Sequence, residues 1–245
     1  TLPVIDAGTT ISICETATTV PITGASSNSS GTLHWSSSGS GSFNNITIIN
    51  PIYTPSAADK TAGSVILTLT ATATPCAVVT DNVTLNFSAL ATANAGTDHS
   101  TCQSQPFTVT GASAPNSTSV SWAENGTGFL TNATTLSPTY TPGAGETGNV
   151  TLTLTANSTL PCPAASDFMV LTVNASPVAF AGADASICVG SDYTIAGASA
   201  SNNIAFSWNE NGTGSLINTS TLSPTYIPGS GETGNITITL SATGN

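Results

Sequence analysis

The chain has 245 residues, of which 39% are apolar and only 5% are charged, with a net charge of -11. An ordinary soluble domain is about a quarter charged, so hydroxyl side chains must hydrate most of this surface. Lys60 is the single cation, and one cation cannot neutralise a nucleic-acid backbone or an anionic bilayer. Because no long apolar run is present either, we expect neither nucleic-acid binding nor membrane insertion.

One set of landmarks returns along the chain at a spacing of about 86 to 88 residues, and such a repeat defines the organisation of a chain. The landmarks are an Ala-Gly pair, a cysteine, a tryptophan and a tyrosine, at Ala7-Gly8, Cys14, Trp35 and Tyr53, at Ala95-Gly96, Cys102, Trp122 and Tyr140, and at Ala181-Gly182, Cys188, Trp208 and Tyr226. We predict three tandem domains, at residues 1–90, 91–176 and 177–245. The junctions are short and lack a Gly/Ser tether, so the domains are expected to form a jointed rod.

Within each copy, apolar and hydroxyl side chains alternate, which predicts β-strands with one buried face. The clearest runs are residues 150–156 and 236–242. Threonine suits the pleated backbone and hydrates the outer face without charge. No window shows a helical stripe with caps, so no helix is predicted. The expected fold class is all-β, with one antiparallel β-sandwich in each copy.

A tight turn is expected after each tryptophan strand. Asn125-Gly126 and Asn211-Gly212 are the preferred residues of a two-residue hairpin, because both turn positions need a positive φ. Ser38-Gly39 takes their place in the first copy. We therefore predict a hairpin at each of these places.

Four of the five cysteines form two pairs about 60 residues apart, Cys14 with Cys76 and Cys102 with Cys162. One disulfide bond within each copy is the economical interpretation, and closing such a loop would stabilise by about 4 kcal/mol in the chain-entropy description. Buried free thiols are the alternative. A zinc site is not expected, because no two cysteines lie two to four residues apart. Disulfide bonds predict an oxidising, extracellular compartment.

Cys188 is left over. Alignment with the second copy places its partner about three residues beyond Asn245, together with the last strand of the sandwich. We therefore expect the third domain to lack its last strand within this chain. A longer polypeptide is one explanation. The other is that the open edge accepts a strand from another subunit, which would allow self-association into a filament, with Cys188 bonded to that subunit.

These motifs together resemble a known type of repeat. Ala-Gly-x-Asp-x-Ser-x-Cys occupies residues 95–102 and 181–188, and Asn-Pro-x-Tyr-x-Pro-Ser-Ala-Ala-Asp occupies residues 50–59. With the tryptophan strand, the Gly-Thr-Gly turn and the Leu-Thr-Leu-Thr strand, this order resembles the immunoglobulin-like or PKD-like tandem repeats of long secreted and cell-surface proteins of Bacteroidota-type bacteria. The resemblance covers essentially the whole chain. It implies three tandem immunoglobulin-like domains and a role in surface fibres or adhesion.

Candidate catalytic groups are sparse. His34 and His99 occupy unlike contexts, so they cannot supply a recurring acid or base, and abundant serine beside a lone histidine is not a triad. Glu146 and Glu232 lie in Gly-x-Gly-Glu-Thr-Gly loops, where solvated acids are the simpler interpretation. We expect neither an enzyme nor a required cofactor.

Calcium is the metal hypothesis that the residues allow, because oxygen ligands at the ends of sandwiches often bind it. The candidate ligands are Asp59, Asp98, Asp184, Glu146 and Glu232. They form no dense acidic string, and Thr10 stands where the later copies have Asp98 and Asp184. The expectation is therefore that no metal is bound.

The repeated tryptophans and tyrosines permit two interpretations. They could form a sugar-stacking platform along the rod. Core packing is the expectation, because each tryptophan lies in a central strand and a large ring fills the space between two sheets.

Asn-x-Ser/Thr sequons are more frequent than the composition predicts, and they mark candidate glycosylation sites in a secreted chain. A threonine-rich strand protein in which asparagine ends turns is the alternative explanation. The candidates are Asn28, Asn45, Asn82, Asn86, Asn116, Asn125, Asn132, Asn149, Asn157, Asn174, Asn211, Asn218 and Asn235.

The sequence thus favours a structural and adhesive segment of an extracellular bacterial fibre, made of tandem immunoglobulin-like sandwiches with disulfide bonds and glycans. The alternative is a carbohydrate- or receptor-binding module of a large adhesin or secreted hydrolase.

Overall fold

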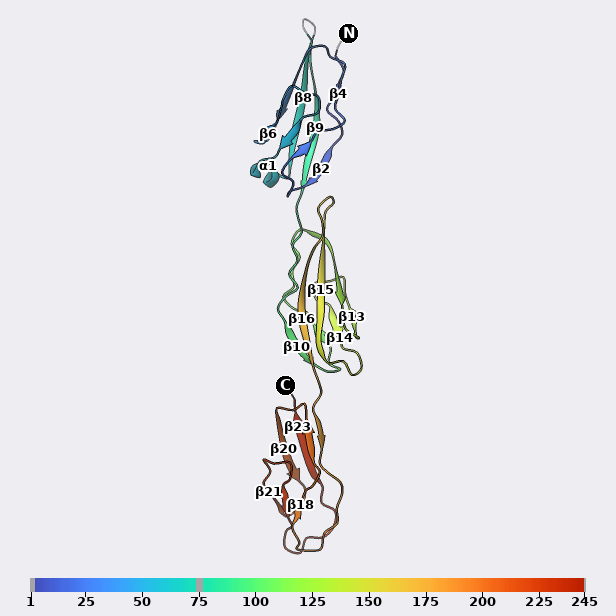
Figure 1. Cartoon of the computed structure of the whole chain (residues 1–245), viewed down its shortest axis with the longest axis vertical. Coiled ribbons are helices and arrows are strands. Elements are labelled where there is room, and N and C mark those ends of the chain that lie inside the picture. Colours follow the sequence, from blue (N-terminus) through green and yellow to red (C-terminus); the bar gives the residue numbers. More distant parts are fainter. Residues whose placement is uncertain (1–2, 74–76, 245) are drawn as a thin grey trace.

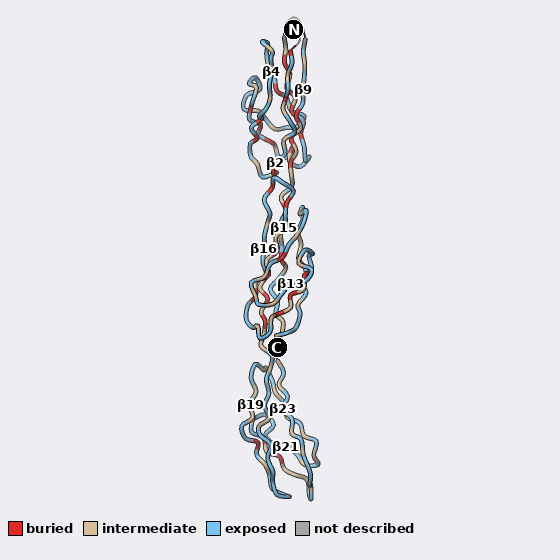
Figure 2. The backbone as a smooth tube through the Cα atoms, turned by 90° about the vertical axis from the view of Figure 1, so that its right-hand side faces the viewer, coloured by how far each residue is buried: buried red, intermediate tan, exposed pale blue. Residues whose placement is uncertain are grey.

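Three β-sandwiches follow one another end to end in the computed structural model, which describes residues 3–73 and 77–244 (Figure 1). The N-terminus lies at the outer end of the first sandwich, and the C-terminus lies beside the joint between the second and third. Buried residues lie inside the sandwiches, surrounded by exposed chain (Figure 2). Among the described residues, no helix has the length and apolar character needed to cross a membrane.

In the first repeat, a four-stranded sheet of order β2-β9-β8-β5 faces a three-stranded sheet of order β3-β7-β6. β2 runs parallel to β9, whereas the other neighbours in these sheets are antiparallel. A short pair, β1 with β4, lies beside them. The strands are β1 (Ile5–Asp6), β2 (Ile11–Cys14), β3 (Val20–Pro21), β4 (Ser26–Ser27), β5 (Thr32–Ser37), β6 (Ser42–Phe43), β7 (Ile52–Thr54), β8 (Ser64–Ala73) and β9 (Ala77–Ser88).

The second repeat has the same two sheets, of order β10-β16-β15-β12 and β11-β14-β13. β10 is parallel to β16, as β2 is to β9. Its strands are β10 (His99–Cys102), β11 (Phe107–Thr108), β12 (Ser117–Glu124), β13 (Phe129–Thr131), β14 (Thr139–Thr141), β15 (Gly148–Ser158) and β16 (Ala165–Asn174).

In the described part of the third repeat, the sheets are β20-β23, β18-β22-β21 and β17-β19. β20 and β23 correspond to β12 and β15, since Trp208 faces Leu240 as Trp122 faces Leu154. The strands are β17 (Val178–Phe180), β18 (Tyr193–Thr194), β19 (Ser199–Ser201), β20 (Ala205–Glu210), β21 (Ser215–Ile217), β22 (Thr225–Ile227) and β23 (Ile238–Thr243).

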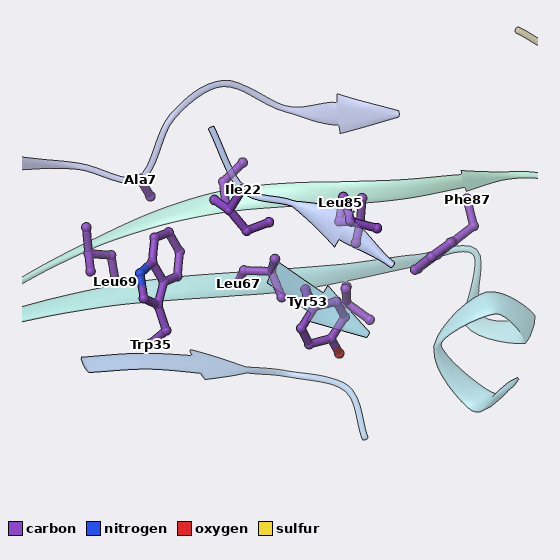
Figure 3. Packing of buried hydrophobic residues seen from close by; sticks show 11 residues of the cluster. Ala7, Ile22, Trp35, Tyr53, Leu67, Leu69, Leu85 and Phe87 are labelled. Carbon is purple, nitrogen blue, oxygen red and sulfur yellow. The ribbon is translucent and has the colours of Figure 1, made fainter. Parts of the chain in front are cut away.

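Alternation along the strands places the apolar side chains between the sheets. In β15, Val150, Leu152 and Leu154 are buried, and the threonines between them are half-exposed. Trp35 is 1% exposed and Trp122 is 6% exposed, so core packing is confirmed for both rings. Figure 3 shows Trp35, Tyr53 and the leucines of β8 and β9 packed together in the first sandwich. Trp208 of the third repeat is half-buried.

One short helix, α1 (Ala57–Ala62), contradicts the prediction that no helix is present. Ser56 is its N-cap, and the side chains of Ser56 and Asp59 each accept a hydrogen bond from the other's backbone N–H. This capping box satisfies two donors at the helix start. Gly63 ends the helix with a φ of 78°, which glycine adopts without steric cost. A six-residue helix is too short to show an apolar period in the sequence.

The predicted two-residue hairpins are also wrong. β12 and β13 belong to different sheets, so Asn125-Gly126 crosses from one sheet to the other. Asn125 Oδ1 accepts a hydrogen bond from the Thr151 amide at 2.7 Å, and Asn211 Oδ1 accepts one from the Thr237 amide at 2.8 Å. The asparagine side chain thus ties the crossing loop to the neighbouring strand.

Candidate functional site

A disulfide bond joins the first sandwich to the second. Cys14 ends β2, at the end of the first sandwich that faces the second (Figure 1). Cys162 lies in the connection between β15 and β16. Their Cα atoms are 4.8 Å apart, and the bond spans 148 residues of sequence. Cys14 is 9% exposed and Cys162 is 3% exposed, so the bond is buried within the joint.

The predicted pairing within each repeat is therefore wrong for Cys14 and Cys162. Cys14 lies beside Ser88 at the end of β9, whereas Ala77 begins that strand and pairs with Ala73. β9 has 12 residues and spans about 40 Å. A bond from Cys14 to the end of the sheet where Ala73 and Ala77 pair would therefore have to cross the length of the sheet. Cys76 itself lies outside the described residues. Cys102 is half-buried at the end of β10, and Cys188 is exposed.

Hydrogen bonds surround the disulfide bond. The Ala91 amide of the connecting segment donates to Ser158 Oγ at 2.9 Å, and this hydroxyl donates to the Pro163 carbonyl at 2.6 Å. Ser88 Oγ, at the end of β9, donates to the Leu160 carbonyl at 3.1 Å. Ala91 is 1% exposed and Ser158 is 8% exposed. The joint is thus a packed contact between two domains, in which the buried Ala91 amide and Ser158 hydroxyl have hydrogen-bond partners.

Two of the hydrogen bonds at this joint recur between the second and third repeats. In each joint, a linker amide donates to a side-chain oxygen that follows β2 or β10, and the carbonyl of the same linker residue accepts from an asparagine side chain. The partners are Leu90 with Glu15 and Asn116, and Ser176 with Gln103 and Asn202. Both asparagines have a positive φ, of 59° and 54°. The two joints share one local design.

Each repeat also contains a tyrosine whose hydroxyl donates to a carboxylate six residues later, an arrangement that we term the tyrosine–carboxylate clasp. The pairs are Tyr53 with Asp59 at 2.7 Å, Tyr140 with Glu146 at 2.8 Å, and Tyr226 with Glu232 at 2.7 Å. Tyr53 and Tyr140 are fully buried, and Tyr226 is 3% exposed.

The same carboxylates hold the crossing loops. Glu146 accepts from the Thr127 amide at 2.6 Å and from the Gly143 amide at 2.8 Å. A Cβ at Gly126 or Gly128 would collide with the Tyr140 hydroxyl, so the Gly-x-Gly loop must carry glycine where it covers the clasp. This close approach, rather than a tight hairpin, is the reason for these glycines.

The clasp shifts the pKa of both its partners. Burial raises the pKa of Tyr140 to about 12, and the hydrogen bond to Glu146 adds to the rise. The backbone N–H of Thr213 lowers the pKa of Glu232 to about 2, with further lowering from Tyr226. Burial alone would raise the pKa of Asp59, but hydrogen bonds from Tyr53 and from the Ser56 and Ser40 amides hold it below its ordinary value.

These contacts assign a structural role to three of the candidate calcium ligands, Asp59, Glu146 and Glu232, whose oxygens accept hydrogen bonds from the chain. Asp98 accepts from the Val170 amide at 2.8 Å, and Asp184 is exposed. Within residues 3–73 and 77–244, no group of three His, Cys, Asp or Glu side chains could hold a metal ion. The interpretation of Glu146 and Glu232 as simple solvated acids missed the tyrosine six residues earlier, which is the signal that could have revealed the clasp.

No family model matches the chain, and no curated protein matches it. Among solved structures, the fragment I67-I69 from the titin I-band has a TM-score of 0.55 at 11% identity, with 99% of this chain and 94% of the fragment covered. Mouse cadherin-23 EC22-24 has a TM-score of 0.49 at 10% identity, with 99% and 94% covered.

The likeness to the titin fragment concerns the fold. Three sandwiches with paired sheets and end-to-end joints place the chain in the class of tandem immunoglobulin-like β-sandwich arrays. At such low identity, the likeness does not define a function.

Disulfide mapping tests the pairing at the joint. Digestion of the oxidised protein without reductant is expected to give one cross-linked peptide that contains Cys14 and Cys162, because these sulfur atoms are bonded in the joint. Mass spectrometry before and after reduction measures it. A Cys188→Ser variant is the control and should give the same peptide. A Cys14–Cys76 peptide in its place would show that the bonds lie within repeats.

The clasps predict a stability that depends on pH. A carboxylate with a folded pKa of about 2 stabilises the fold above its unfolded pKa of about 4.3, and this contribution is lost as the pH falls toward the folded value. A tyrosine with a raised pKa of about 12 stabilises below its unfolded value of about 10, and this is lost as the pH rises toward the folded value. The melting temperature, measured by circular dichroism, should therefore be highest between about pH 5 and pH 10.

A Tyr53→Phe variant separates the contribution of the first clasp to stability from that of other acidic side chains. Tyr53→Phe removes a hydrogen bond to a buried carboxylate and is expected to lower the free energy of unfolding by about 2 kcal/mol at pH 7, with a smaller loss on acidification than in the parent. Tyr193→Phe is the matched control outside the clasps. A melting temperature that stays constant from pH 5 to pH 2 would contradict the assignment.

Proposed function

We propose that the chain is a structural and adhesive segment of an extracellular bacterial surface fibre, built from tandem immunoglobulin-like domains. The observation that carries the proposal is the covalent joint. Cys14–Cys162 and the buried Ala91–Ser158 hydrogen bond hold two sandwiches end to end. Such a joint limits bending, so the array acts as a spacer that keeps what it carries away from a surface. This role needs no catalytic group.

The same bond supports an extracellular location. Disulfide bonds form and persist in oxidising compartments and are rare in the cytosol of mesophiles. This one is buried in the joint, so a reductant reaches it only when the joint opens. The sparse charge of the surface also fits an extracellular chain whose hydration comes from hydroxyl groups and glycans.

The proposal includes glycosylation. The candidate asparagines are exposed apart from Asn86 and Asn174, which are half-buried. Asn132 and Asn218 are exposed at equivalent positions with positive φ of 55° and 59°. The side-chain amide of Asn116 donates a hydrogen bond to the Leu90 carbonyl at the joint. This asparagine is therefore a poorer site for attachment of a glycan. Sugars at the exposed sites would hydrate a chain that is 5% charged.

Self-association through the third repeat is the further part of the proposal. In the second repeat, β16 lies between β10 and β15, and its Asp167 accepts from the Ala95 amide at 2.8 Å. In the third repeat, a groove of about 680 Å³ lies between residues 181–190 and 232–238, which correspond to the neighbours of β16. A strand of the β16 type, supplied by a second copy, would fit between them, and such strand addition would propagate a filament.

The competing hypothesis, a carbohydrate- or receptor-binding module, would use aromatic rings to stack on sugars. Trp35, Trp122 and the clasp tyrosines are buried in the cores, where they cannot contact a ligand. Their position supports the fibre over the sugar platform.

Electron microscopy tests the fibre. The native material is expected to show filaments of repeated globules, and the isolated oxidised chain should be a straight rod of roughly 120 Å, three times the span of its longest strand. The reduced chain, which keeps the linker and loses the bond, is the control and should bend more at the first joint. Isolated compact particles, together with saturable binding on a glycan array, would instead favour the binding module.

Intact-mass measurement of native material tests the glycans. The mass should exceed that of the polypeptide, and glycopeptides should map to exposed turns such as Asn132 and Asn218. Asn86 and Asn174, which lie in strands and are half-buried, serve as internal controls and should be unmodified. A mass equal to that of the polypeptide would refute glycosylation.

A further inference from the structure

The positions of Cys14 and Cys162 in their sandwiches determine how tension passes along the chain. Cys14 is the last residue of β2, and β2 lies beside the last four residues of β9 and runs toward the joint (Figure 1). Cys162 precedes β16, which runs from the joint through the second sandwich to the next linker. The disulfide bond therefore connects the end of one strand to the start of another.

Without the bond, tension would load hydrogen bonds. It would enter the first sandwich through β1 and β2 and leave through the end of β9. β2 and β9 are parallel neighbours, with Ile11 beside Leu85 and Cys14 beside Ser88. Pulling opposite ends of two parallel strands shears the hydrogen bonds between them. The second sandwich repeats this arrangement, since β10 is parallel to β16, with His99 beside Leu171.

When the disulfide bond is present, tension no longer loads either parallel strand pair, β2 with β9 or β10 with β16. We propose that tension crosses the first two domains along a continuous covalent line, β2, Cys14–Cys162 and β16, so that the disulfide bond gives the array a load-bearing function. Strand β2 is pulled at its two ends, and so is β16. The 148-residue loop between the cysteines, which contains β3 to β15 and the first linker, carries no tension. Within this chain, the third repeat is then the part that unfolds under tension.

The inference goes beyond the proposed function and does not require it, because it follows from the connectivity of the joint. It is also specific to the observed pairing. Bonds within repeats, Cys14–Cys76 and Cys102–Cys162, would each shield about 60 residues and would leave the linker between the domains as the only covalent connection.

Single-molecule force spectroscopy on the whole chain, held at its two termini, tests the load path. The oxidised chain is expected to show unfolding of the third repeat only. Reduction, or a Cys14→Ser variant, should restore the unfolding events of the first two repeats and lengthen the fully extended chain by about 50 nm, which is 148 residues at about 3.4 Å each. Cys162→Ser is a second variant with the same expected result, and Cys188→Ser is the control that should match the oxidised parent.

The outcomes are distinct. A gain of about 50 nm on reduction, with two additional events, supports the load path. A gain of about 40 nm, as two loops of about 60 residues would give, overturns it in favour of pairing within the repeats. Equal lengths for the oxidised parent and Cys14→Ser also overturn it. None of these outcomes depends on whether native material forms filaments, so the proposed function can fail while the load path stands.

Discussion

The Cys14–Cys162 bond is the constraint on which the architecture of the first two repeats depends. Each sandwich has its own core, but the bond places the end of β2 against the connection that follows β15. In that position the buried hydroxyl of Ser158 accepts a hydrogen bond from the Ala91 amide of the linker and donates one to the Pro163 carbonyl, in the connection between β15 and β16. A chain with a single cation can form few ion pairs with which to fix one domain against another. Covalent and hydrogen-bonded contacts take over that task.

Inside each sandwich, the tyrosine–carboxylate clasp performs a related task between the two sheets. Tyr140 lies in β14 of one sheet, and the loop that covers it leaves β12 of the other. One carboxylate satisfies the tyrosine hydroxyl and loop amides together. A buried phenol without a partner would be costly, so the clasp allows a large ring to fill the core. The first repeat reaches the same contacts with Asp59 in a short helix.

The sequence predicted the all-β class, the strand alternation and the burial of Trp35 and Trp122, because these depend on local periodicity. It failed where the outcome depends on how elements meet in space. A spacing of about 60 residues between cysteines occurs in both the first and the second repeat, so it is compatible with bonds inside a domain and with a bond across a joint. Only the position of Cys14, at the end of the sheet opposite the β8–β9 connection, decides between them. Likewise, Asn125-Gly126 has the composition of a hairpin, yet the tyrosine hydroxyl that requires the glycine lies in another strand.

The separation of the bonded cysteines also orders the biogenesis of the chain. Because a chain is synthesised from its N-terminus, Cys14 emerges long before Cys162 and meets Cys76 and Cys102 first. The first sandwich can therefore fold before the cross-link forms, and the Cys14–Cys162 bond can close only after Cys162, which follows β15, has appeared. Formation of the native bond then proceeds one domain behind synthesis, and thiol–disulfide exchange would serve to correct early, mismatched bonds.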